Sequence, residues 1–352
     1  MILRDAKFDN LGRERSVYSL MLYYIIRRII IIVPLLLILS IVSFIIIQLP
    51  PGSFLDTYVS TLKLSGTEVS DAEIARLVKL YDLDKPLYIQ YFTWIKNIVL
   101  HGDLGRSFQW NRPVSQLIGE RIGLTMLISI LTVLFTWIIA VPIGIYSALH
   151  QYSIFDYLFT FLGFIGLALP SFLVALIVVW GAFSIFGISV TGLFSAKFIN
   201  APWSWARVID MLKHIWVPMI IIGISGTAGL IRTMRANLLD ELRKQYVITA
   251  RAKGLPERRL IFKYPVRIAV NPLISTIGWM LPGVVGGEVI VSIVLNIPTT
   301  GPLLYSALQS QDMYLAGSFI LILSTLTVIG TLISDILLAW LDPRVRYGGI
   351  GE

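Results

Sequence analysis

Charged residues and cysteine are scarce in this sequence. Only 14% of its 352 residues are Asp, Glu, Lys or Arg, and 56% are hydrophobic. A soluble domain carries roughly 25% charged residues, so this chain has too little polar surface to cover a water-soluble globule, and lipid must cover part of it. The lack of cysteine excludes disulfides, thiolate metal sites and cysteine nucleophiles.

Sequence motifs of catalysis are also missing. There is no phosphate-binding loop of the form G-x-x-x-x-G-K-[ST], no H-E-x-x-H and no G-x-S-x-G. The three histidines lie in different segments of the chain, at His101, His150 and His214. We therefore expect no enzyme activity, no metal and no cofactor on this chain, and any energy that it uses must come from partner chains.

Long hydrophobic runs are the main feature that is present. A spanning helix needs about 20 mostly apolar residues, and six segments reach that length. They are 29–49, 122–148, 157–187, 215–235, 269–295 and 315–341. The sequence therefore predicts an all-α integral membrane protein with six transmembrane helices. The third and fifth segments are longer than the bilayer requires, so we expect them to tilt, kink or extend beyond it.

Lys and Arg gather on one side of the predicted helices. The stretch 232–267 contains ten of them, whereas residues 296–314 contain none. By the positive-inside rule, this stretch and both termini lie in the cytoplasm. The net charge of +8 follows from this distribution, so we expect a lipid bilayer and no nucleic acid as a partner.

The expected boundaries follow from these segments. The first run is longer than a signal-peptide core and has no cleavage site, so we interpret it as an uncleaved helix. The divisions are a cytoplasmic N-terminal segment 1–28, transmembrane helix 29–49, an extracytoplasmic insert 50–121, a five-helix core 122–341 and a cytoplasmic tail 342–352.

The insert is predicted to be a small helical cap. Ser70 and Glu73 have the spacing of a capping box. Pro86 suits the first turn of a second helix, which Gly102 and Gly105 would end.

Two acidic residues fall within the predicted spanning segments. An ion-coupled transporter needs such groups, because charges in mid-membrane are costly unless they have a function. We expect Asp335 to be interfacial and paired with a basic residue. Glu288 lies nearer mid-span and either faces a water-filled cavity or bonds a neighbouring subunit. A secondary transporter or channel subunit is the alternative function, although the inverted repeats of secondary transporters are not evident.

The segment 236–268 is far longer than a connection between two helices requires. Its apolar residues fall at helical spacing up to Lys253. Gly254 suits a left-handed helix end, and Pro256 suits the start of a second helix. The small residues Ala250, Ala252 and Gly254 would let the turn enter a partner's cleft. A basic helix–turn–helix of this kind either docks on a cytosolic motor or lies on anionic lipid, and the pattern alone leaves both open.

The residues 245–259, Gln-Tyr-Val-Ile-Thr-Ala-Arg-Ala-Lys-Gly-Leu-Pro-Glu-Arg-Arg, resemble the EAA coupling loop of ABC importer permeases. The resemblance is closest to the dipeptide/oligopeptide/nickel family, in its first-permease branch, and covers about residues 23–346. Further matching motifs are Arg27-Arg28, Pro51-Gly52, Gly102-Asp103-Leu104-Gly105-Arg106-Ser107, Arg112-Pro113-Val114, Leu169-Pro170-Ser171-Phe172, Arg232-Thr233-Met234-Arg235 and Leu341-Asp342-Pro343-Arg344-Val345-Arg346.

The resemblance implies the permease subunit of an ATP-driven importer in a prokaryotic inner membrane. Its substrates would be short peptides, oligosaccharides or nickel complexes. Its partners would be a second homologous permease, an extracytoplasmic solute-binding protein and two cytosolic ABC ATPases, which bind ATP and Mg. The coupling residues carried over are Tyr246, Thr249, Ala250, Arg251, Ala252, Lys253, Gly254, Leu255, Glu257 and Arg258.

The sequence departs from the family pattern in two places. Tyr264-Pro265 stands after the coupling loop, so we expect Pro265 to end the second loop helix early. Ser292 stands where the family commonly has a glutamate, and Glu288, one turn earlier, is a candidate to replace that carboxylate. The candidate gate residues are Glu288, Ser292, Pro298 and Gly301.

Overall fold

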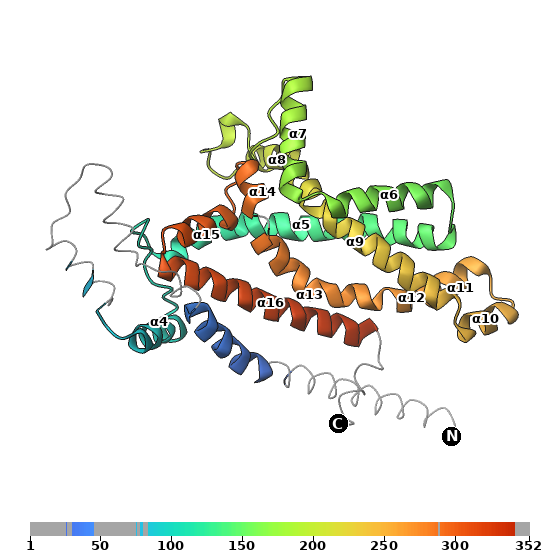
Figure 1. Cartoon of the computed structure of the whole chain (residues 1–352), viewed down its shortest axis with the longest axis horizontal. Coiled ribbons are helices and arrows are strands. Elements are labelled where there is room, and N and C mark those ends of the chain that lie inside the picture. Colours follow the sequence, from blue (N-terminus) through green and yellow to red (C-terminus); the bar gives the residue numbers. More distant parts are fainter. Residues whose placement is uncertain are drawn as a thin grey trace.

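The computed structural model describes residues 26, 30–45, 75, 78–79, 84–287 and 289–341. Within these residues the secondary structure is helical, apart from one isolated bridge between Arg106 and Pro113. The helices form an elongated bundle (Figure 1). One end of the bundle holds α10 (Gln245–Ala252), α11 (Glu257–Lys263) and α12 (Pro265–Ala269). The opposite end holds α4 (Leu87–His101) and α15 (Thr300–Gln309).

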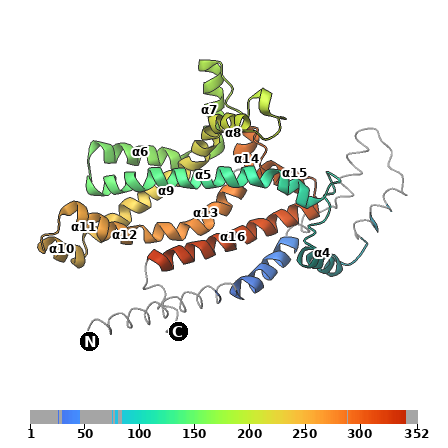
Figure 2. The ribbon, with the colours of Figure 1, turned by 180° about the vertical axis from the view of Figure 1, so that it is seen from behind.

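Two pairs of long helices carry the bundle. α5 (Val114–Leu149) packs along α9 (Trp216–Leu242), and α13 (Asn271–Gly287) packs along α16 (Met313–Leu341). Figure 2 shows the same arrangement from behind. By length and composition, α5, α9 and α16 can each cross a membrane. These helices correspond to the second, fourth and sixth predicted segments.

At two of the predicted boundaries the helices extend beyond the hydrophobic runs. α9 continues to Leu242 rather than ending at residue 235, so the first seven residues of the predicted loop 236–268 belong to the long helix. α5 begins at Val114, so the last eight residues of the predicted insert 50–121 are helical and continuous with the core. In both places polar residues extend an apolar helix beyond its hydrophobic run, which a hydropathy boundary does not detect.

The third predicted segment is not one helix. α6 (Ile154–Ala168) and α7 (Ser171–Phe186) meet at an angle of 102°. Leu169 between them is extended, with φ −88° and ψ 125°, because the residue before a proline is disfavoured in the helical region. Together the two helices are either a broken span or a re-entrant loop. The expected kink is therefore a sharp break at Leu169-Pro170.

The first and fifth predicted segments are covered in pieces. A helix from Ile30 to Ile45 lies within the predicted 29–49 and is 16 residues long. The predicted 269–295 contains α13 and α14 (Val289–Val294), on either side of residue 288, which lies outside the described residues.

The outer insert is described from residue 84 onward, so the predicted capping box of Ser70 and Glu73 lies outside the described residues. α4 begins directly after Pro86 and ends at Gly102, which has φ 64°, as the sequence predicts. Trp94 of α4 lies in a buried cluster with Phe44, Phe108 and Met313. The insert is thus packed on the bundle rather than separate from it.

Candidate functional site

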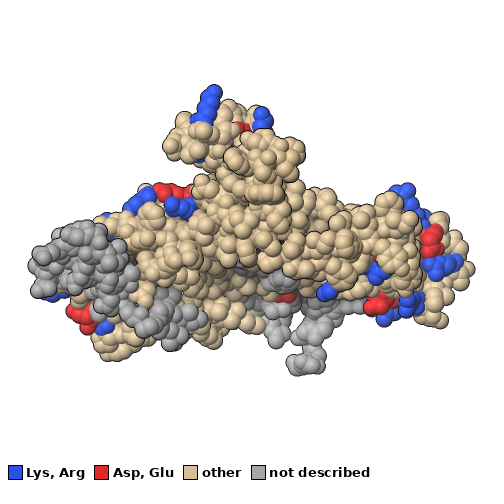
Figure 3. Space-filling view, turned by 45° about the horizontal axis from the view of Figure 1, so that its top comes forward, with Lys and Arg blue, Asp and Glu red and all other residues tan. Residues whose placement is uncertain are grey.

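The hairpin formed by α10 and α11, residues 245–263, is the candidate functional site. It projects from one end of the bundle, and Figure 3 shows charged side chains gathered at that end while the middle of the same face has almost none. It follows α9 after a short turn at Arg243-Lys244, with Lys244 extended at the start of α10. The helix predicted from residue 237 to Lys253 is therefore interrupted at this turn.

The hairpin has a small hydrophobic core of its own. Val247 and Leu260 are completely buried, and Ala250 and Ile261 are nearly so. Leu149 at the end of α5 and Leu242 at the end of α9 pack against this core. The hairpin is therefore fixed to the ends of two long helices, and a force applied to it is transmitted to them.

Gly254 closes the turn between the two helices. Its φ is +76°, a left-handed conformation that costs an L-residue with a side chain roughly 1–2 kcal/mol. A Cβ built on Gly254 would meet no atom within 4 Å. The turn is therefore open on its outer side, and nothing within the described chain covers it.

An ion pair fastens the turn on its exposed side. The Arg251 guanidinium donates to the Glu257 carboxylate, with an Nε to Oε2 distance of 3.0 Å. The hydrogen bond from Arg251 lowers the pKa of Glu257 below its ordinary value. Burial and the hydrogen bond to Glu241 raise the pKa of the Tyr246 phenol. Both directions favour the charge states at neutral pH that these two hydrogen bonds require, an ionised Glu257 and a protonated Tyr246.

The ten predicted coupling residues divide into two groups. Tyr246, Ala250 and Leu255 face the hairpin core and are partly or fully buried. The other seven form a continuous exposed turn and are Thr249, Arg251, Ala252, Lys253, Gly254, Glu257 and Arg258. Ala250 packs inward into the core of the hairpin, whereas Ala252 and Gly254 are exposed, so the prediction of a slim turn that enters a partner's cleft stays a prediction.

Pro265 has the effect that the sequence predicts. α11 ends at Lys263, and Pro265 occupies the first position of α12. Pro265 is buried. The side chain of Asn237 in α9 donates a hydrogen bond to the Ala269 carbonyl in α12, at 3.3 Å. α9 leads into the hairpin, and α12, which follows the hairpin, packs on α9. The hairpin is therefore attached to α9 at both of its ends.

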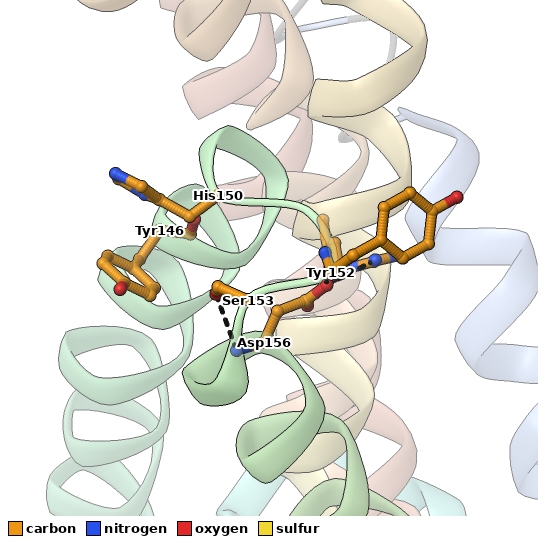
Figure 4. A network of polar contacts seen from close by, with 6 residues as sticks. Tyr146, His150, Tyr152, Ser153 and Asp156 are labelled. Atoms are coloured by element: carbon orange, nitrogen blue, oxygen red, sulfur yellow. Dashed lines mark hydrogen bonds and ion pairs between the residues drawn. The ribbon is translucent and has the colours of Figure 1, made fainter.

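A buried ion pair beside the hairpin was not anticipated. Asp156 is 2% exposed and accepts two hydrogen bonds of 2.8 Å from the Arg235 guanidinium. It also accepts from the Tyr152 backbone, and its own N–H donates to the Ser153 hydroxyl at 3.2 Å. Figure 4 shows this network, in which the turn from α5 to α6 is attached to α9. Ser153 and Asp156 have capping spacing, but no local signal pairs Asp156 with a residue 79 positions away.

Three of the four candidate gate residues come together between α14 and α15. Ser292 is buried in α14, and its carbonyl accepts from the Ile297 amide at 2.9 Å. Pro298 is exposed in the following turn. Gly301 packs tightly against Val289, because a Cβ added to Gly301 would lie 3.1 Å from the Cα of Val289. Glu288 lies outside the described residues.

A second buried carboxylate holds the opposite end of the molecule. Asp312 is completely buried and accepts from the Ser107 hydroxyl, the Gln109 amide at 3.1 Å and the Leu315 amide at 3.2 Å. It therefore caps α16 and attaches the loop after α4 to it. The sequence analysis noted Ser107 within a family motif but gave no sign of its partner.

The described part of the chain has no group of three or more His, Asp or Glu residues placed to hold a metal ion. Asp156 and Asp312 instead accept hydrogen bonds at the starts of α6 and α16. The hairpin exposes no nucleophile paired with a base. What it offers is an exposed, polar, small-residue turn at the end of long apolar helices.

Comparison with known proteins identifies the family to which the chain belongs. Residues 140–347 match the family described as binding-protein-dependent transport system inner membrane component, and residues 21–130 match the N-terminal part of such membrane components. The oligopeptide transport system permease protein AppB of Bacillus subtilis is 35% identical over 310 residues, which cover 88% of this chain and 94% of AppB. The oligopeptide permease OppB of Haemophilus influenzae is 30% identical over 329 residues, covering 93% and 100%. The dipeptide permease DppB of Alkalihalophilus pseudofirmus is 31% identical, covering 88% and 95%.

Several helices that are long and apolar enough to cross a membrane define a multi-pass membrane protein. The chain belongs to the binding-protein-dependent transport system inner membrane component family. It is a permease subunit of an ABC importer in the inner membrane, and transport systems of this kind include ATPase and solute-binding partners. The resemblance noted from the residues 245–259 is confirmed.

Proposed function

We propose that this chain forms half of the translocation pathway for short peptides, with a second homologous permease forming the other half. The relatives that match it over most of its length are named for oligopeptide or dipeptide transport. An extracytoplasmic solute-binding protein delivers the peptide, and two cytosolic ATPases, which bind ATP and Mg, drive the cycle. The substrate class follows from these names and not from a pocket in the described chain.

The proposed topology has six spans, with both termini and the α10–α11 hairpin in the cytoplasm. The spans are the helix beginning at Ile30, α5, the α6–α7 pair, α9, α13 and α16. The distribution of Lys and Arg supports this orientation, because the stretch 232–267 carries ten of them. The proposed divisions remain 1–28, 29–49, 50–121, 122–341 and 342–352, and α5 begins within the last part of the insert.

The hairpin is proposed to dock in a cleft of an ATPase and to act as a lever. The observation that carries this proposal is that the hairpin has its own buried core and leaves its polar turn exposed. Closure of the ATPases would move the hairpin as one body and α9 with it. A switch between two states requires contacts that differ between them, and the α14–α15 segment with Ser292 and Gly301 is the proposed gate.

Replacing Gly254 with Asp tests this proposal. We expect Gly254→Asp to abolish ATP-driven peptide uptake, because the side chain would project into the docking interface, while the chain still inserts in the membrane. Gly187→Asp is the matched control, since Gly187 also has a left-handed backbone, with φ 65°, and open space around its Cβ position. Normal uptake by Gly254→Asp, or equal loss in both variants, would contradict the docking assignment.

A further inference from the structure

The segment that joins α7 to α9 carries all the charge in a long apolar stretch. Between residues 157 and 231 the charged residues are Lys197, Arg207, Asp210 and Lys213. All four lie in the projecting segment 187–215, which includes α8 (Trp205–His214) and is seen at the top of Figure 3. Charges are costly within hydrocarbon, so the boundary between lipid and water must pass along this segment.

The inner face of α8 is firmly held. Asp210 accepts from both the backbone amide and the hydroxyl of Ser195, at 2.7 and 2.5 Å. The Arg207 guanidinium lies over the rings of Phe194 and Trp203, 4.5 and 4.7 Å from their centroids, and donates to the Ile199 carbonyl. These contacts fix the rotation of the helix about its axis. Its outward face is therefore set by the structure.

That outward face is an apolar stripe. Trp205, Ile209 and Leu212 recur at helical spacing and are 83%, 53% and 55% exposed. Trp216, at the start of α9, is 51% exposed and donates its indole N–H to the Lys213 carbonyl at 3.0 Å. On the opposite side of the helix Asp210 and Met211 are buried. The helix thus places Arg207 and Asp210 on its held side and its large apolar side chains outward, in contrast to a helix that exposes its polar face to water.

We infer that α8 lies in the plane of the membrane interface, with its Trp205–Ile209–Leu212 stripe inserted among the lipids and its basic residues on anionic headgroups. Trp is enriched at the headgroup level, and helices of this kind combine Trp and Leu on one face with Lys or Arg beside it. Lys213 is exposed next to the stripe, Lys197 is exposed elsewhere in the same segment, and the one acid of the segment, Asp210, is buried.

A lipid surface fits this face better than a protein subunit does. Protein interfaces are depleted of Lys, whereas Lys213 adjoins the stripe directly. The stripe is also narrow, because it is one face of a ten-residue helix. Its placement on the outer leaflet rests on the proposed six-span topology, but its contact with lipid does not.

The absence of native cysteine allows single labels to be introduced cleanly. The full-length permease would carry a nitroxide label at Trp205→Cys or Leu212→Cys, in nanodiscs of phosphatidylcholine and phosphatidylglycerol. We expect collisions with oxygen, which concentrates in lipid, to exceed those with a water-soluble nickel complex at both positions. Lys197→Cys is the control, where the nickel complex should dominate. Raising the phosphatidylglycerol content should shift the stripe labels deeper, and replacing Lys197 and Lys213 by Gln should remove this shift.

Two outcomes would overturn the inference. If the nickel complex reached the labels at Trp205→Cys and Leu212→Cys as readily as the label at Lys197→Cys, the stripe would lie in water. Low access of both reagents with a motionally restricted label would place it against another subunit. A membrane-impermeant maleimide applied to Lys197→Cys tests the topology separately. Reaction only from the cytoplasmic side would contradict the proposed orientation and leave the lipid contact standing.

Discussion

At the scale of single residues, the helices are fixed by a few close contacts that tolerate little change. Gly144 of α5 is one of them, because a Cβ added there would lie 2.7 Å from the Met234 Cβ and 3.0 Å from the Ile231 carbonyl. Met234 is itself fully buried. The main helix pair therefore approaches closely at a position where no side chain fits.

Gly144→Ala should lower the stability of the chain. We expect a cost of about 1–3 kcal/mol from overpacking, seen as a lower thermal midpoint of the purified permease. Gly163→Ala is the matched control, because its Cβ would make an ordinary 3.9 Å contact with Ala228. An equal shift in both variants would show that helix packing at Gly144 is looser than described.

The carboxylate of Asp312 is the second sensitive residue. Asp312→Asn turns an amide N–H toward groups that already donate, so we expect the loop after α4 to loosen, at a cost of about 1–3 kcal/mol. Limited proteolysis within residues 102–113 would measure it. Asp103→Asn is the control, since Asp103 accepts only an exposed hydrogen bond from the Gly105 amide among the contacts described. Similar cleavage of both variants would contradict the predicted role.

The buried carboxyl group of Asp312 also predicts that the stability of the fold depends on pH. Burial raises the pKa of Asp312 above its ordinary value, so the folded state retains the proton to a higher pH than the unfolded state does. The stability that this group contributes is then full at acid pH and falls as the pH rises toward the folded pKa. Asp312→Asn should remove this fall, and thermal midpoints measured across the carboxyl range would test it.

At the scale of elements, the hairpin of α10 and α11 combines two roles in neighbouring residues. Val247 and Leu260 point into its core, whereas Ile248 on the same helix as Val247 is 49% exposed. The core keeps the hairpin rigid, and the exposed side is available to a partner. Substitutions on the two sides should therefore fail in different ways.

Leu260→Ala should melt the hairpin, because removing a buried leucine side chain costs about 2–5 kcal/mol. We expect faster amide hydrogen exchange across residues 245–263 together with loss of uptake. Ile248→Ala should leave the exchange unchanged and weaken ATPase binding alone. Unchanged exchange in Leu260→Ala would show that the hairpin is not held by its own core.

The elements could be predicted from the sequence to different degrees. Apolar runs located α5, α9 and α16, and the Gly254 and Pro256 pattern located the hairpin turn, because local chemistry determines both. The 102° break at Leu169-Pro170 was expected only as a kink, since a proline marks the place of a bend and not its angle. The partners of Asp156 and Asp312 could not be predicted, because Arg235 and Ser107 reach them only through the tertiary fold.

At the scale of the whole molecule, α9 connects the two proposed contact regions. It begins at Trp216 beside the interfacial helix α8 and ends at Leu242 in the core of the hairpin. Asp156 and Arg235 attach α6 to it near the hairpin. On the proposed function and the proposed lipid contact of α8, an ATPase would act on α9 at its hairpin end while α8 holds its other end at the membrane.

The most direct test of this account is a crosslink from the hairpin turn to an ATPase. Lys253→Cys introduces the single thiol of the chain at the exposed turn, and the permease would be purified with its partners. We predict a crosslinked product of permease and ATPase whose yield differs between the nucleotide-free and ATP-trapped states. Modification of Lys253→Cys only from the outer side of the membrane, or a purified assembly that contains no ATPase, would contradict the central claim.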